Sequence, residues 1–361
     1  MLIVLSYEIG SHFEFDSKMK LKGKENTDWL PNATDTAMTF SGRAAIELAI
    51  RDMKMNHKIK SVYMPSYCCY SMIAPFINHN INIIYYDVEH CYKDGISYDI
   101  NLAEDCDVFF AMSYFGLEDF KLNFAIESFL RRGKTIIEDI THRLLCKEAY
   151  SNMAHYSIAS IRKWLPVPTG GYIAKQSGSL SHKPHLESDH LVLQKIKAME
   201  EKHQYLCGDN IDKNSYLDKF AEFERKFGSL DSTYMIDNLS LDIIKNLDIE
   251  KVRTSRRNNA RILYDSIETL PHIKPLIPTP NLENDCPLFV PVMIETEKRD
   301  DLRKYLIENN IYCPVHWPHK DQMSSKIPEN ELSLICDQRY TEADMEYIIK
   351  VIERWTKKYI S

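Results

Sequence analysis

Short apolar runs alternate with amphipathic stretches along the first half of the chain. Apolar residues recur at helical spacing in 44–54 and 120–133. The apolar runs between and around these stretches are KSVYMPS (60–66), INIIYYDV (81–88), DVFFAMSYFG (107–116) and KTIIEDI (134–140). Strands separated by helices predict a βαβ architecture with a mainly parallel sheet. Because ligands bind beyond the carboxyl ends of such strands, polar residues at those ends are the first candidates for a functional site.

The second half of the chain has a different pattern. Residues 176–230 are polar and charged, and the stretch QSGSLSHKPH (176–185) is typical of a loop. A helical pattern then predicts one long helix from about 238 to the residue before Pro271. The elements expected after it are a strand at 286–294, a helix at 298–310, a strand and turn at 311–318, and a helix at 341–358 that starts with the capping pair Thr341 and Asp344.

This change of pattern predicts two domains. We expect a large α/β domain over 1–237 and a smaller α+β domain over 238–361, with the N-terminal segment 1–30 as a candidate to pack on the smaller one. A chain of 361 residues suits this division because a single hydrophobic core rarely grows to that size.

Composition narrows the possible functions. The net charge of −7 gives no general attraction to nucleic acid or to anionic membranes. No run approaches the ~20 apolar residues of a membrane span, and the N-terminus lacks the pattern of a signal peptide. The nine cysteines form no C-x-x-C pair, which argues against a zinc or thioredoxin-type site. We therefore expect a cytoplasmic protein with reduced thiols, no metal, and no nucleic-acid or membrane partner.

A candidate anion site precedes the first amphipathic helix. Ser41 and Gly42 stand where the helix begins, and Arg43 adds a positive charge. The backbone N–H groups and the positive dipole end of a helix N-terminus bind phosphate, and glycine allows a close approach. The alternative is an ordinary helix cap, since Ser-Gly is common before helices.

A pair of carboxylates ends the apolar run at 134–140. Glu138 and Asp139 stand there, and His142 follows three residues after Asp139. A carboxylate at a buried strand end can hold a protonated ring nitrogen through a charge-assisted hydrogen bond, as a pyridinium cofactor requires. The alternative is a solvated turn or a helix cap.

Lys163 lies among residues that restrict the backbone. Pro166 and Pro168 stiffen the loop that follows it, and Gly170–Gly171 allow a tight turn before the next apolar run. A lysine that forms a Schiff base must hold one position, whereas a lysine in a solvated surface loop need not. Taken in order, an anion site, a strand-end carboxylate and a fixed lysine match the phosphate, ring nitrogen and aldehyde carbon of pyridoxal phosphate (PLP).

These motifs, in this order, resemble the DegT/DnrJ/StrS family of PLP-dependent sugar aminotransferases, which have PLP fold type I. The resemblance extends over most of the chain. The stretches that carry it most clearly are FSGRAAIELAI (40–50), IIEDITHRLL (136–145), SIASIRKWLPVPTGG (157–171) and VRTSRRNNARILYDSI (252–267). It implies a mainly parallel central sheet with flanking helices, followed by a small C-terminal α+β domain.

The resemblance also implies roles for individual residues. Lys163 would form the Schiff base, Asp139 would pair with the pyridine nitrogen, and His142 would lie near the phenolic oxygen. Ser41, Gly42 and Arg43 would hold the phosphate, together with Ser157 or Ser160. Cys69 occupies the position of the aromatic residue that stacks on the ring, so Tyr70 or Tyr67 would replace it. Tyr234, in the loop STYM (232–235) that a partner subunit extends into the site, and His316, at the mouth of the site, would contact substrate.

The function that follows from the resemblance is amino-group transfer. An amino-acid donor, glutamate in this family, would supply the amine, and a nucleotide-linked keto-sugar would accept it in a homodimer with sites at the subunit interface. Two alternatives keep the cofactor and change the chemistry. One is a PLP-dependent sugar dehydratase or lyase, and the other is a PLP-binding protein without catalysis.

Overall fold

A computed structural model describes most of the chain. It covers residues 7–18, 26–91, 95–116, 120–228, 232–278, 280–294, 298–317 and 327–359. Parts of two sequence expectations lie outside the described residues, namely residue 318 at the end of the predicted strand and turn 311–318 and much of the N-terminal segment 1–30.

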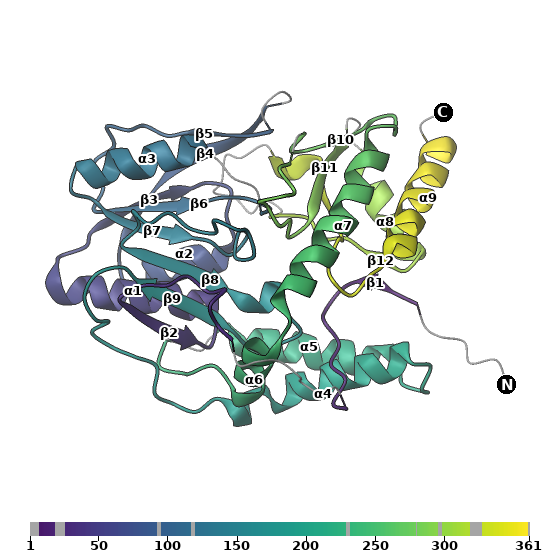
Figure 1. The fold of residues 1–361 in the computed structure, drawn as a ribbon, viewed down its shortest axis with the longest axis horizontal. Helices are drawn as coiled ribbons and strands as arrows, with labels where there is room; N and C mark the ends of the chain where they lie inside the picture. The colour runs from purple at the N-terminus through teal and green to yellow at the C-terminus, as the bar shows by residue number, and fades with distance from the viewer. Residues whose placement is uncertain are drawn as a thin grey trace.

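An eight-stranded sheet forms the larger part of the molecule (Figure 1). Its strand order is β2-β9-β8-β7-β6-β3-β4-β5, and the pairs β8–β7, β7–β6, β6–β3 and β3–β4 are parallel. The strands are β2 (Asp35–Thr39), β3 (Ser61–Pro65), β4 (Asn82–Cys91), β5 (Gly95–Asp99), β6 (Val108–Met112), β7 (Thr135–Asp139), β8 (Tyr156–Ser160) and β9 (Gly171–Lys175). This confirms the predicted α/β fold with a mainly parallel sheet.

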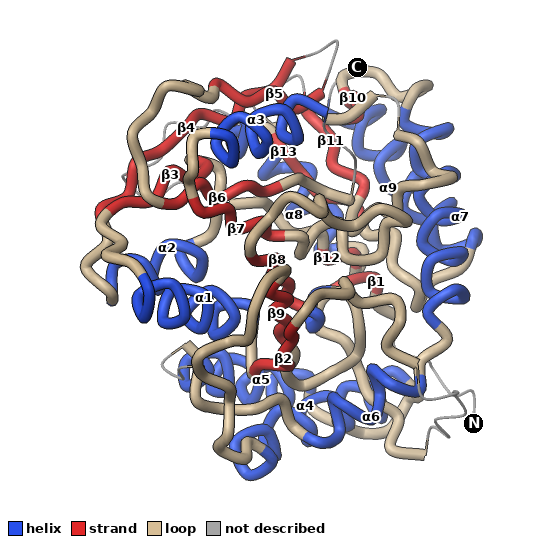
Figure 2. Tube along the Cα trace, turned by 60° about the vertical axis from the view of Figure 1, so that its left-hand side comes forward, coloured by secondary structure: helices blue, strands red, loops and turns tan. Residues whose placement is uncertain are grey.

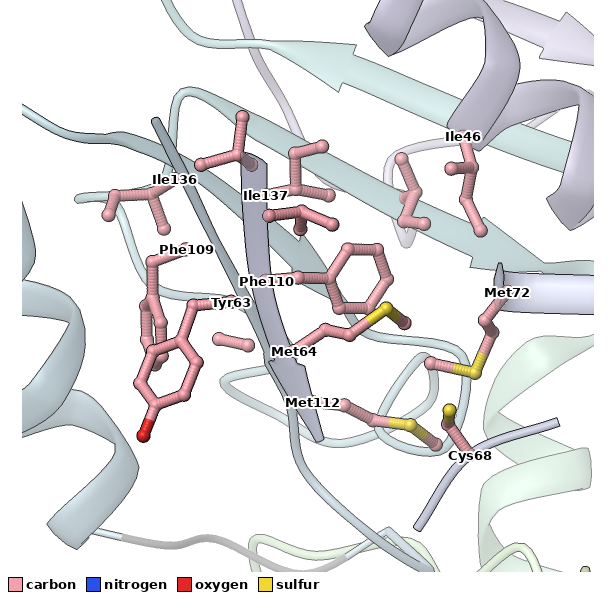
Figure 3. Packing of buried hydrophobic residues seen from close by; sticks show 14 of the residues in the cluster. Ile46, Tyr63, Met64, Cys68, Met72, Phe109, Phe110, Met112, Ile136 and Ile137 are labelled. Carbon is pink, nitrogen blue, oxygen red and sulfur yellow. The ribbon is translucent and has the colours of Figure 1, made fainter. Parts of the chain in front are cut away.

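Helices cover both faces of this sheet. Phe129 of α3 (Phe120–Arg131) stacks on Phe109 of β6, while Phe76 of α2 (Tyr70–Asn78) meets Phe110 on the opposite face. Figure 3 shows the same alternation, with Phe110 and Met112 on one side of the strands and Phe109 on the other. Alternate side chains of a strand point to opposite faces, so a strand buried on both sides must be apolar throughout. Helix α1 (Gly42–Asn56) adds its apolar face to the same core as α2.

The C-terminal part has a core of its own. It combines the three-stranded antiparallel sheet β10 (Ile273–Pro275), β11 (Val290–Ile294) and β13 (Glu331–Leu334) with the helices α7 (Ile249–Ile267), α8 (Arg299–Glu308) and α9 (Glu342–Tyr359). The N-terminal strand β1 (Ile9–Gly10) pairs in parallel with β12 (Ile311–Tyr312), and Ile9 is buried in this C-terminal core. Ile243 and Ile244 of α6 (Asn238–Asn246) instead pack with the large-sheet residues around Trp164. The domain boundary at 237/238 stays a prediction.

Two expectations about helices differ from the structure. The predicted long helix from 238 is two helices, α6 and α7, because Asp248 caps a new helix start by accepting a hydrogen bond from the N–H of Lys251. The polar region 176–230 begins with the expected loop and then forms an antiparallel pair of helices, α4 (Asp189–Leu206) and α5 (Lys213–Phe227), which the sequence reasoning missed. Figure 2 shows these two helices below the edge of the sheet formed by β2 and β9.

Gly171 provides a test of the packing that brings α1 to the sheet. A Cβ at this position would overlap the carbonyl group of Ser41 and the Thr39 side chain, so Gly171→Ala should lower the free energy of unfolding by about 1–3 kcal/mol. Urea denaturation measures the loss. Gly228→Ala is the control, because an added Cβ would lie 3.4 Å from the Arg43 guanidinium, and we expect a change within about 0.5 kcal/mol. Equal stabilities of the two variants would contradict this packing.

Candidate active site

The N-terminus of α1 meets the end of β8. Ser41 caps the helix, and its side chain accepts a hydrogen bond from the N–H of Ala44 at 3.1 Å. A Cβ on Gly42 would lie 3.0 Å from the Cβ of Ser160, so only glycine fits here without a shift. The free N–H groups at the start of α1 and the Ser160 side chain therefore face the same space, which is the arrangement of an anion site.

Asp139 ends β7 beside this space. Its carboxylate is 5% exposed and accepts a hydrogen bond from the N–H of Thr141 at 2.8 Å. Burial raises the pKa of Asp139, while the hydrogen bonds from Thr141 and the charge of Lys163 act in the opposite direction. Thr141 also accepts a hydrogen bond from the N–H of Ser160 at 3.0 Å, which fixes the end of β7 against the end of β8.

Lys163 is held from several sides. It ends a short 3-10 helix, Ile161–Lys163, and is followed by the fully buried Trp164. The indole of Trp164 donates to the carbonyl of Thr141 at 2.6 Å, and its own carbonyl accepts from Gln338 at 2.8 Å. The guanidinium of Arg256 lies 4.7 Å from the indole ring centre. Contacts with both parts of the molecule thus fix the backbone at Lys163, as the prolines and glycines of this loop suggested.

These three elements line one cavity of about 200 Å³, called here the small cavity. Its apolar side includes Met72 and Met112, which are labelled in Figure 3. The predicted site residues that line it are Ser41, Gly42, Arg43, Cys69, Asp139, Ser160 and Lys163. The structure thus brings together residues that lie more than a hundred positions apart in the sequence.

Strand alternation separates the two candidate serines. Ser160 lines the small cavity, whereas Ser157 points to the other face of β8, where its hydroxyl is fully buried without a partner among the described residues. Cys69 lines the small cavity and caps α2, but Tyr70 is 68% exposed and lies outside it. Of the candidates for contact with a ring, the structure places Cys69 at the cavity.

His142 is a buried neutral imidazole. Burial, and then the charges of Lys163 and His316, hold its pKa well below the usual value. Its Nδ1 atom accepts a hydrogen bond from the N–H of Phe115 at 3.1 Å, so its proton is on Nε2. This Nε2–H donor has no hydrogen-bond partner among the described residues, which is costly for a buried polar group. The imidazole stacks on Trp317, whose ring lies 5.8 Å from the Lys163 amine.

The three predicted substrate residues lie elsewhere. Tyr67 is buried, and its hydroxyl donates to the carbonyl of His316 at 2.8 Å. The His316 ring lies 3.0 Å from the hydroxyl of Ser333, and its backbone N–H donates to the buried carboxylate of Glu331. Tyr234 packs against Phe40. All three lie outside the two described cavities that Lys163 lines.

Sequence reasoning missed the contribution of α4 and α5. Glu224 and Phe227 of α5 line the small cavity, and Glu224 forms ion pairs with Arg162 at 2.7 Å and with Lys195 of α4 at 3.3 Å. The guanidinium of Arg43 donates to the carbonyl of Gly228 at the end of α5, while its Nε has no partner among the described residues. The sequence does contain a pattern that predicts helix α5. Its aromatic residues recur at helical spacing, namely Tyr216, Phe220, Phe223 and Phe227.

A second, larger cavity of about 380 Å³, called here the large cavity, lies on the other side of Lys163 and Arg162. Among the described residues no group of histidine, cysteine and acidic side chains is arranged to hold a metal ion. In the same part of the chain no helix is both long and apolar enough to cross a membrane.

Comparison with known proteins supports the fold. No protein-family model matches the chain, and no curated protein matches its sequence. The aminotransferase TlmJ from Streptoalloteichus hindustanus is 12% identical, with a TM-score of 0.63 over 90% of this chain and 87% of TlmJ. A DegT DnrJ EryC1 StrS aminotransferase from Brucella abortus is 15% identical, with a TM-score of 0.59 over 90% and 86% of the two chains.

A third solved structure carries a cofactor in its description. The proposed sugar aminotransferase Spr1654 from Streptococcus pneumoniae, described in a PLP form and in a PMP form, is 14% identical to this chain. The PLP form has a TM-score of 0.60 over 90% of this chain and 88% of its own. At these identities the likeness shows the fold alone, which this chain shares with these aminotransferases.

Glu138, on the face of β7 opposite Asp139, gives the site a testable pH signature. Burial raises its pKa to about 7, although it accepts a hydrogen bond from the N–H of Ser151 at 2.8 Å. Because the native pKa of Glu138 is higher than the unfolded-state value of 4.5, the protonated carboxyl stabilises the fold at low pH. This contribution is full below pH 4.5 and is lost as the pH rises through 7. Glu138→Gln should remove that dependence, which amounts to about 3 kcal/mol.

The comparison is the free energy of unfolding of wild type and Glu138→Gln between pH 4.5 and pH 8. The free energy of unfolding of Glu138→Gln should rise relative to that of the wild type as the pH increases. Glu148→Gln, an exposed glutamate in the following loop, serves as the control and should parallel the wild type. Parallel curves for all three proteins would show that Glu138 titrates normally.

Proposed function

We propose that this chain is a PLP-dependent aminotransferase that moves an amino group from an amino-acid donor to a keto-sugar. The observation that carries the proposal is the small cavity, where the N-terminus of α1, the carboxylate of Asp139 and the amine of Lys163 meet. These are the three groups that a pyridoxal phosphate molecule needs at its phosphate, its ring nitrogen and its aldehyde carbon. The cavity volume of about 200 Å³ suits one small cofactor.

The phosphate end of the cavity fits an anion. Free N–H groups at the start of α1, the hydroxyl groups of Ser41 and Ser160, and the positive charge of Arg43 surround it. Gly42 leaves room for close approach, because a side chain there would press on Ser160. The Nε atom of Arg43, buried without a partner among the described residues, is a further donor for this group.

The ring end fits a protonated pyridine. Asp139 is buried and fixed by Thr141, so its carboxylate can hold a proton at the ring nitrogen through a short charge-assisted hydrogen bond. The unpartnered Nε2–H of His142 is the kind of donor that a phenolic oxygen would satisfy. An unpaired buried donor in a fold this well packed supports a bound group near it.

Lys163 has the mobile role. Its Nζ atom would hold the aldehyde end of the cofactor and, once released, would take the proton that leaves the α carbon of the amino donor. The bound cofactor supplies an electron sink for this proton shift. The rigid Trp164 anchor keeps the lysine backbone still, so that only the side chain moves.

The identity of the substrates rests on the resemblance and on the neighbours. Glutamate as donor, a nucleotide-linked keto-sugar as acceptor, and a homodimer with its sites at the interface are the expected properties of the resembled family. The structural neighbour Spr1654 is described as a proposed sugar aminotransferase, which supports a sugar as the acceptor.

Lys163→Ala tests the covalent role. Wild-type protein mixed with PLP should develop an absorption band near ~420 nm, and borohydride should fix the cofactor on Lys163, as mass spectrometry of the peptide would show. Lys163→Ala should lose both signals because no other amine is held at that carbon. Lys197→Ala removes an exposed lysine of α4 and should keep both. A fixed adduct that persists in Lys163→Ala would disprove the assignment.

Asp139→Asn tests the electron sink. The amide cannot keep the ring nitrogen protonated, so amine transfer from glutamate to a nucleotide-linked keto-sugar should slow on the order of 100-fold or more. Glu138→Gln, one position away on the opposite face of β7, should transfer amine at the wild-type rate. Equal rates in Asp139→Asn and wild type would remove Asp139 from the mechanism. A deoxy product without incorporated amine would instead indicate a dehydratase.

A further inference from the structure

The large cavity is unusually rich in positive charge. Its lining comes from residues 11–13, the 3-10 helix Ile161–Lys163 (called here the lysine turn), helices α4 and α5, and the C-terminal part. Figure 1 shows the N-terminal residues running between these parts. Six cationic side chains line it, against one lining carboxylate, Asp337. The cations are Arg162, Lys163, Lys195, Arg256, Arg303 and Arg339.

Part of this charge is already neutralised. Arg339 pairs with Asp337 at 2.8 Å and with Glu14 at 3.0 Å, and it also donates to backbone carbonyls of the N-terminal segment. Arg162 and Lys195 share the single carboxylate of Glu224. One carboxylate for two cations leaves the cavity wall formed by the 3-10 helix Ile161–Lys163 and α4 with a net positive charge.

Arg256 and Arg303 donate hydrogen bonds only to neutral groups among the described residues, and the charge of the buried Asp337 also acts on Arg256. Arg256 is 1% exposed and donates to the amide oxygen of Gln338 at 2.8 Å and to the carbonyl of Leu288 at 3.1 Å. Arg303, which is exposed, donates to the carbonyl of Cys313 at 3.2 Å. Carbonyl dipoles satisfy the hydrogen bonds of a guanidinium but do not cancel its charge. A buried net charge is unfavourable unless an ion of the opposite sign joins it.

The environment of Lys195 supports the binding of an anionic ligand in this cavity. Its side chain is 7% exposed, its amine lies 4.7 Å from the ring centre of Phe223, and it shares the carboxylate of Glu224 with Arg162. Burial and the neighbouring Arg162 lower its pKa to about 7. An oxyanion in the cavity would stabilise the charged form of this amine.

We propose that the large cavity is a dicarboxylate-binding site, formed within one chain, in which Lys195 and Arg303 receive the carboxylates of the amino donor. The identification of the ligand as the amino donor rests on the proposed aminotransferase function. Lys163 lines this cavity, and the amine of the donor must reach the same cofactor carbon atom that Lys163 binds. Two carboxylates balance the excess charge better than one. Arg303 at the exposed side and Lys195 at the buried side lie on different elements, so a ligand with separated carboxylates can meet both.

The experiment measures glutarate binding by isothermal titration calorimetry. Glutarate carries two carboxylates and no amine, so it binds without reacting. We expect saturable binding to PLP-loaded wild-type protein and no binding of glutaramide, its uncharged analogue. Lys195→Gln and Arg303→Gln should each weaken glutarate binding on the order of 10-fold, the loss expected for one hydrogen bond to a charged group. Lys195→Gln keeps a hydrogen-bond donor for Glu224.

Two further variants separate charge from folding. Arg225→Gln removes an exposed cation from the same hairpin, outside the cavity lining, and should bind glutarate as the wild type does. Arg303→Lys keeps the positive charge at the open side and should retain most of the affinity. Thermal unfolding midpoints of all variants show whether each protein is folded.

The outcomes separate this proposal from the proposed function. No glutarate binding, or equal binding by wild type, Lys195→Gln and Arg303→Gln, would overturn the dicarboxylate site even if PLP binds to Lys163. A second result would also overturn it. If uridine diphosphate displaces glutarate, and Lys195→Gln weakens the binding of uridine diphosphate more than that of glutarate, the cavity binds the phosphates of the acceptor. Variant-sensitive glutarate binding in a protein that fails to bind PLP would leave the anion site standing and remove the aminotransferase proposal.

Discussion

The site depends on a backbone contact between Gly171 and Ser41. No side chain fits at Gly171, because a Cβ would overlap the Ser41 carbonyl group. This contact places the start of β9 against the start of α1, and the neighbouring N–H of Gly170 donates to the carbonyl of Phe40 at 3.1 Å. The carbonyl of Gly170 in turn accepts from the N–H of Ile161, where the lysine turn begins. One glycine pair therefore sets the distance between the helix N-terminus and the lysine.

A second constraint comes from polar groups that the fold buries without partners. The Nε2–H of His142 and the Nε of Arg43 have no hydrogen-bond partner among the described residues. Each such group costs about 1–3 kcal/mol, and a ligand in the small cavity that hydrogen-bonds to these two groups would recover that cost. Two buried carboxylates at the end of β7 add to the same cost, since burial raises the pKa values of both Glu138 and Asp139. Stability given up at one place is typical of sites that bind a ligand.

Local patterns predicted the strands and the residues at their ends. The apolar run that ends at Asp139 was readable because a strand buried on both faces is continuously apolar, whereas the strand that ends at Ser160 was not predicted. Strand alternation also separates Ser157 from Ser160, but only when the strand is known to include both. The break at Asp248 and the helices of the polar region were less visible, because caps and single aromatic stripes are weak signals in charged sequence.

Long-range contacts could not be predicted from one sequence. Trp164 is fixed by Arg256 and Gln338, which follow it by 92 and 174 positions, and Glu224 reaches Arg162 from a helix that was read only as polar sequence. The exposure of Tyr70 and the packing of His316 against Ser333 depend on the same tertiary arrangement. The fold was thus largely readable, and most residues predicted to hold a cofactor line the small cavity, whereas the second cavity and its charges were not predicted.

The most direct test of the central claim is an experimental structure of the protein grown with PLP. The account predicts continuous density from the Nζ of Lys163 into the small cavity, with the ring nitrogen next to Asp139 and the phosphate between Gly42 and Ser160. Density for PLP away from these residues, or a phosphate bound at the opposite end of the cavity, would contradict it.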